Sequence, residues 1–213
     1  MKGVQDLSLF VKWRPIHQKI DDGRLSVFGI GGVSFPLSNY PADFLPLSIG
    51  LRSKTASARI MVDYINSGFF LTVSGTYVFR DNIEIDRSSY YTTEMHYTNE
   101  VEMPDATNLN IRAGFRNHRI IAEAIFNQWT TEGGFDITRN NMPFPSNRMN
   151  ASTAGVNIKY VLPPLPQLSI VAGGTTTLKG RNVGDATGFY GSLFYVFDFS
   201  RKEKSSDQPS KTN

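Results

Sequence analysis

A two-residue alternation of apolar and polar side chains constrains this chain more than any other feature. From Thr55 to Tyr64 the even positions are Ala, Ala, Ile, Val and Tyr, while the odd positions are Thr, Ser, Arg, Met and Asp. After Asn66-Ser67-Gly68, the segment from Phe69 to Arg80 repeats the alternation in the opposite phase. Successive side chains of a strand point to opposite faces, so these segments predict two strands with one apolar face, joined by a tight hairpin.

The same alternation recurs along the chain, and helix signals are nearly absent. With the two strands above, it predicts about nine strands, most of them near the roughly 9 to 11 residues that cross a bilayer at a tilt. The other predicted strands are Asp6 to Arg14, Leu25 to Phe35, Asn108 to Arg116, Ile120 to Trp129, Asn150 to Val161, Leu168 to Lys179 and Phe189 to Phe199.

One hairpin allows a prediction of register. Asn117-His118 has the length and composition of a turn of about two residues between two alternating segments. Such a turn places Arg112 directly across from Glu123 on the polar face, at the distance where charges on neighbouring strands pair.

Composition excludes several classes of protein. Hydrophobic residues make up 40% and charged residues 19%, yet the mean hydropathy is -0.26 and no apolar run approaches the roughly 18 residues of a spanning helix. A barrel reconciles these values, because alternate residues face lipid and lumen. Cysteine is absent and the three histidines are scattered, so no metal site and no cofactor are expected. The net charge of +3 has no cluster typical of a nucleic-acid surface, and no nucleic-acid partner is expected.

Short and long connections alternate in the order expected of an outer-membrane barrel, with tight turns in the periplasm and longer loops outside. The short links are Pro15 to Gly23, Asn66 to Gly68, Asn117-His118 and Leu162 to Gln167; the longer ones are Pro36 to Leu51, Asn82 to Ala106, Glu132 to Asn147 and Gly180 to Thr187. The predicted fold is therefore all-β, an antiparallel up-and-down transmembrane β-barrel over residues 1–199, with a polar periplasmic tail at 200–213.

This topology also predicts an upstream segment. The first strand would begin at the cell surface, whereas single-chain bacterial barrels have even strand counts and both termini in the periplasm. We therefore expect an odd number of additional strands, about three, before Met1. A signal peptide is expected there too, because Met1 to Asp6 has no apolar core.

The first strand and the next loop resemble a known family. Gly3-Val4-Gln5-Asp6 through Lys12-Trp13-Arg14 is similar to the G-x-x-D-x-x-x-x-x-K-Y-R strand of outer-membrane transporters of the meta-pathway phenol-degradation family. Pro36 to Tyr40, followed by Pro46 to Leu51, resembles that family's next loop, which contains a P-x-x-x-G segment. The resemblance implies a barrel, export to the outer membrane and passage of small hydrophobic or aromatic compounds. The segment Asn82 to Ala106 departs from the family pattern, and fold alone does not supply function.

The candidate site is the polar inner face of the sheet. Charges there must meet water or each other, so two interpretations are open: a salt-bridged plug of side chains, or a selective water-filled path lined with arginine. Besides Asp6, the predicted lumen-lining residues are Lys12, Arg14, Arg59, Asp63, Arg80, Arg112, Arg116, Glu123, Lys159 and Asp198.

A second candidate site is the loop from Gly133 to Arg148. Phe135, Met142 and Phe144 lie between polar residues there and could form a ligand-gathering lid, but packing of the loop onto its own rim is the favoured interpretation. No catalytic residues are expected: His17 and His118 fall in predicted turns and His96 in a loop, none beside a plausible nucleophile.

The sequence thus predicts a channel or transporter of the bacterial outer membrane for small molecules, hydrophobic or aromatic ones among them. Its expected partners are outer-membrane lipid, the permeant and the barrel-assembly machinery. One alternative is a structural or surface-binding barrel with a plugged lumen that acts through its loops. Another is a soluble β-sandwich or lipocalin-like barrel, in which the stripe with Phe69, Leu71 and Val73 would pack into a core.

Overall fold

The computed structural model of the protein describes residues 4–43, 48, 50–139 and 143–197. These residues contain strands and no helix, and therefore no helix that could cross a membrane. Nine strands form one antiparallel sheet, and each of them pairs with the strands of the sheet that precede and follow it along the chain. They are β1 (Asp6–Ile20), β2 (Gly23–Pro36), β3 (Thr55–Asn66), β4 (Phe69–Arg80), β9 (Ala106–Arg116), β10 (Ile120–Thr131), β11 (Asn150–Val161), β12 (Leu168–Arg181) and β13 (Thr187–Tyr195).

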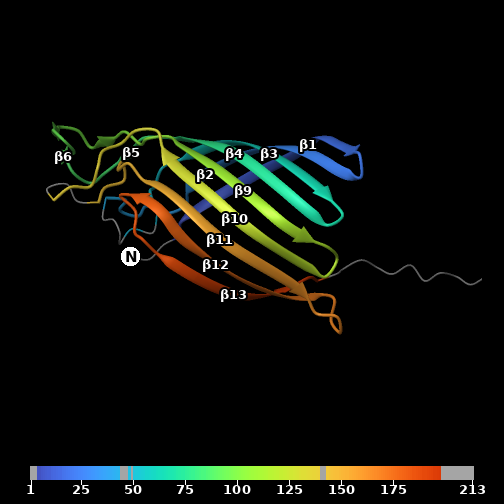
Figure 1. Ribbon diagram of the computed structural model, residues 1–213. Coiled ribbons are helices and arrows are strands. Elements are labelled where there is room, and N and C mark those ends of the chain that lie inside the picture. The colour runs from blue at the N-terminus through green and yellow to red at the C-terminus, as the bar shows by residue number, and fades with distance from the viewer. Residues whose placement is uncertain (1–3, 44–47, 49, 140–142, 198–213) are drawn as a thin grey trace, which may run out of the picture.

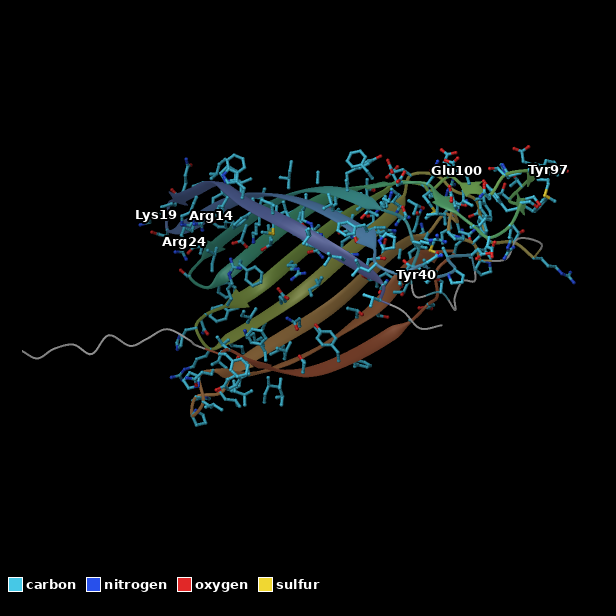
Figure 2. The ribbon with its side chains drawn as sticks, turned by 180° about the vertical axis from the view of Figure 1, so that it is seen from behind. Arg14, Lys19, Arg24, Tyr40, Tyr97 and Glu100 are labelled. Carbon is cyan, nitrogen blue, oxygen red and sulfur yellow. The ribbon has the colours of Figure 1, made fainter. Side chains whose placement is uncertain are left out.

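The two ends of the sheet differ. Figure 1 shows the strands side by side at a common tilt, with tight hairpins at one end and longer connections at the other. Figure 2 places Lys19 and Arg24 at the hairpin end, and Tyr40, Tyr97 and Glu100 at the opposite end. The all-β, antiparallel, up-and-down arrangement predicted from the alternation is confirmed.

The longest connection carries two small hairpins of its own. Strand β5 (Ile83–Glu84) pairs with β8 (Glu100–Val101), and β6 (Tyr90–Tyr91) pairs with β7 (Met95–His96).

The first hairpin differs from the prediction. We expected a strand ending at Arg14 and a link from Pro15 to Gly23, but β1 continues to Ile20 and the turn is reduced to Asp21-Asp22. The pairing with β2 shifts between Trp13 and Ile16, which marks a β-bulge around Pro15. Proline lacks an N–H and is tolerated at bulges and on edge strands, and β1 is an edge strand.

The predicted register of Arg112 is also wrong. Arg112 lies opposite Ile125, and Glu123 lies opposite Gly114. The cause is the position of the turn, which is His118-Arg119 in place of Asn117-His118. The Asn117 N–H donates to the Ile120 carbonyl oxygen, and the Asn117 side-chain carbonyl accepts hydrogen bonds from the backbone N–H groups of Arg119 and Ile120. The tight hairpin expected at Asn66 to Gly68 is present. Its turn consists of Ser67 and Gly68, and both residues have positive φ, as a type I′ hairpin requires.

The two faces of the sheet have opposite characters. The convex face, which carries Ile60 and Phe69, exposes large apolar side chains, and these two residues are 67% and 68% exposed. The concave face, which carries Arg59, Asp63 and Thr76, is polar. Its side chains from β4 are buried or half-buried, as is Asp63, whereas Arg59 is exposed. Among the described residues no second sheet packs on the convex face, so the core expected of a soluble sandwich is not formed by this stripe.

The edges of the sheet are open in the described residues. Strand β1 pairs only with β2, and β13 pairs only with β12, so a closed barrel is not present. Because β1 and β13 are the first and ninth strands of an antiparallel series, they run in the same direction. Strand β13 ends at Tyr195, and the remainder of the predicted last strand, with the tail at 200–213, falls largely outside the described residues.

The longer connections pack together at their end of the sheet. Their buried apolar side chains form a cluster that we call the loop cap, drawn from three connections: the one after β2, the one between β4 and β9, and the one after β10. Its members are Ala42, Ile83, Ile85, Val101, Met103 and Phe144, with Leu51, Tyr90 and Phe135 packed against them. The apolar core of the described chain is therefore located in its loops.

Candidate functional site

The concave face gathers most of the predicted lumen-lining residues. In the register of the sheet, Lys12 lies opposite Ile30, Ile30 lies opposite Arg59, and Arg59 lies opposite Thr76, so their side chains share one face. The same register places Asp63, Arg80, Arg112, Arg116, Glu123 and Lys159 on that face. Arg14 lies within the bulge of β1, and Asp198 lies outside the described residues.

An ion pair joins β3 to β9 across this face. Arg116 Nη2 lies 2.5 Å from Asp63 Oδ2, and the Thr72 hydroxyl donates to the other oxygen of the same carboxylate. The Arg116 guanidinium also lies 4.6 Å from the centroid of the Phe70 ring. Asp63 is thus held by two donors from two strands, which fixes the position of the guanidinium relative to the sheet.

A chain of polar contacts crosses the sheet from β9 to β13. Arg112 Nη1 lies 3.6 Å from Glu123 Oε1, so the charge pairing predicted for these residues is present on the diagonal and not directly across. Glu123 accepts from Asn157 Nδ2 at 3.1 Å, and Asn157 accepts from the Tyr190 hydroxyl at 2.9 Å. On the other side, the Arg112 Nε donates to Asn110, and Asn110 and Asn108 donate to Asn127.

Gly173 makes the last link of this chain possible. It lies between Asn157 of β11 and Tyr190 of β13 in the register. A Cβ added at Gly173 would lie 2.5 Å from the Tyr190 hydroxyl and 2.6 Å from the Val156 carbonyl oxygen. The missing side chain lets the tyrosine cross β12 and reach β11.

Several cations on this face contact aromatic rings. The ammonium groups of Lys12 and Lys159 each lie 4.2 Å from a ring centroid, those of Phe28 and Phe194 respectively. The Arg80 guanidinium lies 5.4 Å from the Trp129 ring. Such contacts stabilise a cation without neutralising its charge, in contrast to an ion pair.

The loop candidates are arranged differently from the expected exposed lid. Phe144 is only 7% exposed and stacks on Tyr90 at 5.2 Å between ring centroids, while Phe135 packs against it at 6.2 Å. Phe144 is therefore part of the loop cap and is not an exposed ligand-gathering residue, because three connections meet at this point and cover it. Met142 lies outside the described residues.

Two polar contacts attach the connections to the sheet. Tyr40 is buried, its hydroxyl donates to Asp6 at 3.0 Å and accepts from the Arg52 N–H, and burial raises its pKa. Asp136 accepts from Arg181 at 2.8 and 2.6 Å and from Asn182 at 2.8 Å. The donors from Arg181 and Asn182 lower the pKa of Asp136 to about 2. The second contact ties the connection after β10 to the end of β12.

The Asp136 contact predicts a pH dependence. Because the pKa of Asp136 falls to about 2 from 3.8, its contribution is complete above pH 3.8 and is lost as the pH falls toward 2. Hydrogen exchange of residues 133–139, corrected for the intrinsic rate at each pH, is expected to accelerate over this window. In the Asp136→Asn variant the acceleration should be absent; an unchanged acceleration would contradict the assignment to this carboxyl.

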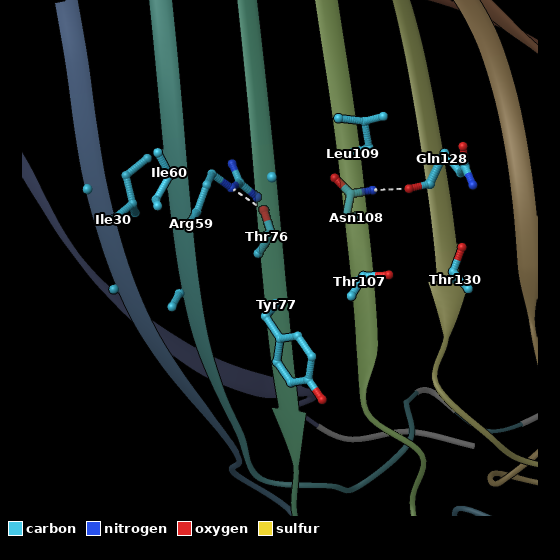
Figure 3. A pocket seen from close by; sticks show the side chains of 14 residues that line it. Ile30, Arg59, Ile60, Thr76, Tyr77, Thr107, Asn108, Leu109, Gln128 and Thr130 are labelled. Atoms are coloured by element: carbon cyan, nitrogen blue, oxygen red, sulfur yellow. Dashed lines mark hydrogen bonds between the residues drawn. The ribbon is translucent and has the colours of Figure 1, made fainter.

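The convex face contains a shallow apolar hollow, which Figure 3 shows from close by. Its volume is about 810 Å³, and Gly29, Gly31, Ala58 and Gly75 form its floor because they leave the space above the sheet empty. The side chains of Ile60, Tyr77 and Leu109 surround it. The hollow is continuous with the exposed apolar surface and brings no titratable pair together.

Sequence reasoning missed the amide part of the site. Asn127, Asn157 and Tyr190 connect the predicted charges to one another, but none was singled out. The signal that could have found them is their position at inward-facing sites of otherwise alternating strands, where a polar side chain needs a partner.

Comparison with known proteins adds no assignment. No protein-family model matches the chain, and no curated protein is significantly similar to it. The case for a function therefore depends on the residues and the geometry described above.

Proposed function

We propose that the protein is a β-barrel of the bacterial outer membrane that passes small molecules along its concave face. The observation that carries this proposal is the large exposed apolar surface of the convex face, from Trp13 and Ile60 to Phe69 and Leu193. Soluble monomers rarely expose a contiguous apolar patch of this extent, and lipid is the solvent that covers such a face in barrels. The polar concave face then surrounds the path of the permeant.

Barrel closure places a geometric condition on the edges. Strands β1 and β13 run in the same direction, so they can meet directly only as a parallel pair. Closure by antiparallel pairs takes an odd number of further strands between them. An open edge is unfavourable in lipid because its backbone groups have no hydrogen-bond partner there, so the proposal requires one of these two arrangements.

The permeant proposed is a small molecule, hydrophobic or aromatic ones included, as the family resemblance of the first strand implies. The proposed partners are outer-membrane lipid and the machinery that assembles barrels. No enzymatic role is proposed. His17, expected in a turn, lies in β1 with its Nδ1 3.0 Å from the Ser26 Oγ, but among the described residues no carboxylate hydrogen-bonds to the ring to orient it as a base.

A second candidate function is favoured by the chain of contacts from Asn108 to Tyr190. Such a network fills part of the space that a permeant would use, as expected for a plugged barrel that acts through its loops. Conductance of the protein in planar bilayers separates the two candidates. Discrete conductance steps support the channel, and a silent bilayer with correctly inserted protein supports the plugged barrel.

The two tryptophans provide a test of membrane insertion. Trp13 is 68% exposed on the convex face, beside Gly29 and Ile60 in the register, whereas Trp129 lies on the concave face near Arg80. Lipids brominated on the acyl chain are expected to quench Trp13 strongly, because it contacts hydrocarbon. Trp129 should respond weakly to these lipids and more strongly to acrylamide in the water.

The measurement uses Trp129→Phe to isolate Trp13 and Trp13→Phe to isolate Trp129, each reconstituted in liposomes. The two positions lie in adjacent rows of the register and on opposite faces of the sheet. Equal quenching of both by brominated lipid, or of neither, would remove the membrane proposal.

A further inference from the structure

The charges of the concave face are strongly unequal. Among the described strand residues outside the β1 bulge, eight cationic side chains face inward: Lys12, Lys19, Arg24, Arg59, Arg80, Arg112, Arg116 and Lys159. Three carboxylates share that face: Asp6, Asp63 and Glu123. An excess of five positive charges remains on one side of a single sheet.

Most of this charge is not neutralised locally. Arg112 and Arg116 pair with Glu123 and Asp63, but no carboxylate of the described residues lies within ion-pair distance of the other six cations. Asp6 is engaged by the Tyr40 hydroxyl. The positive charge of this face is therefore available to ions in the adjoining water.

Aromatic rings hold several of these cations in place. Lys12, Lys159 and Arg80 lie over Phe28, Phe194 and Trp129, and the Arg59 Nε donates to the Thr76 hydroxyl at 2.8 Å. These partners are uncharged, so they order the cations without neutralising them. Arg80 is in addition close to the Asp105 carboxylate, which accepts from its backbone N–H. A concave wall of one sign concentrates that field and raises the local concentration of ions of the opposite sign.

From this arrangement we infer that the concave face attracts small anions, and that a channel lined by it passes anions in preference to cations. The second half of this inference rests on the proposed channel function. The first half does not, because it concerns the electrostatic potential of the face itself.

Trp129 serves as the probe of that potential. In the Trp13→Phe protein, quenching by iodide and by caesium is compared at equal ionic strength, with neutral acrylamide as the measure of access. A potential of about one kT enriches iodide and depletes caesium by about threefold each, so the ratio of the two quenching constants is expected to be severalfold above that of free tryptophan.

Charge removal should lower the ratio in a graded way. Arg80→Gln removes the cation over the Trp129 ring and should lower the ratio most. Arg59 lies in the same row of the register as Trp129 but three strands away, and Arg59→Gln should lower the ratio less because salt screens charges beyond about 10 Å. Lys179→Gln is the matched control, since Lys179 shares a row with Leu109 and Gln128 on the convex face, and it should leave the ratio unchanged. A ratio of the two quenching constants equal to that of free tryptophan overturns the inference.

Reversal potentials in a potassium chloride gradient test the selectivity. An anion-to-cation permeability ratio above about three is expected, and it should fall in Arg59→Gln and Lys159→Gln but not in Lys179→Gln. Conductance with cation preference overturns the selectivity. Iodide preference at Trp129 without any conductance supports the anion-attracting face and counts against the channel, so the two proposals fail separately.

Discussion

Arginine in place of Ile60 is expected to lower the free energy of unfolding from a lipid bilayer by about 2–4 kcal/mol, the cost of this side chain at the midplane of a barrel wall. Ile60 lies near the middle of β3 on the convex face and is 67% exposed. In the proposed arrangement that exposed surface contacts hydrocarbon, and a guanidinium there loses its water without gaining a partner. Urea unfolding of the protein from liposomes measures the difference.

The neighbouring position supplies the control. Met61 lies on the concave face between Phe28 and Ser74 in the register, so arginine at Met61 would meet the polar side of the sheet. Met61→Arg is therefore expected to cost clearly less than Ile60→Arg in the bilayer. A soluble protein predicts the reverse order, because an exposed Ile60 would accept a charge freely while a half-buried Met61 would not. That reverse order would contradict a lipid-facing convex surface.

The strands and their two faces could be predicted from the sequence because the alternation that defines them is local. Alternation with a period of two assigns each residue of β3, β4 and β11 to a face without any knowledge of its neighbours. Strands β4 and β11 have the bounds expected from the pattern, and β3 begins where expected but continues past Tyr64 to Asn66. The β1 hairpin required more. Pro15 is a strand breaker in isolation, and it is accommodated only because β1 lies at an edge and bulges there.

The charged residues of the candidate site could be predicted from the sequence, but the contacts that they make could not. Inward-facing Asp63, Arg112, Arg116 and Glu123 follow from the alternation, but their partners depend on the position of a turn and on pairs between non-adjacent residues. A shift of the turn by one position, from Asn117-His118 to His118-Arg119, moved the partner of Arg112 by two residues, from Glu123 to Ile125. Strand closure cannot be read from alternation at all, since it depends on which edges meet.

How Phe144 is buried in the loop cap could not be predicted from the sequence either. Phe144 stands in a polar, proline-rich segment, and nothing local indicates that it is covered. Its burial depends on Ile83, Val101 and Tyr90, which belong to a connection about 50 residues earlier in the chain. Burial of this kind is a property of loops meeting in space, so the sequence could suggest that the loop packs onto its own rim but could not identify the connection that covers Phe144.

Phe144→Ala is accordingly expected to destabilise the loop cap by about 3–5 kcal/mol, the usual cost of removing a buried phenylalanine. Hydrogen exchange of the backbone at 83–85 and 100–103 should accelerate, because these segments lose the ring that packs against them. The sheet should be less affected, since its strands are held by their own ladders and by contacts on the concave face.

Tyr97→Ala is the matched variant for this prediction. Tyr97 belongs to the same connection as Tyr90 but is 87% exposed, so removal of its ring should change exchange in the cap little. A ligand-gathering role for Phe144 predicts a different pattern, with unchanged exchange and weakened uptake of apolar solutes. Faster exchange in Phe144→Ala, together with unchanged exchange in Tyr97→Ala, would identify Phe144 as the centre of a structural cap. The burial of this ring then holds the loops in position at the end of the sheet.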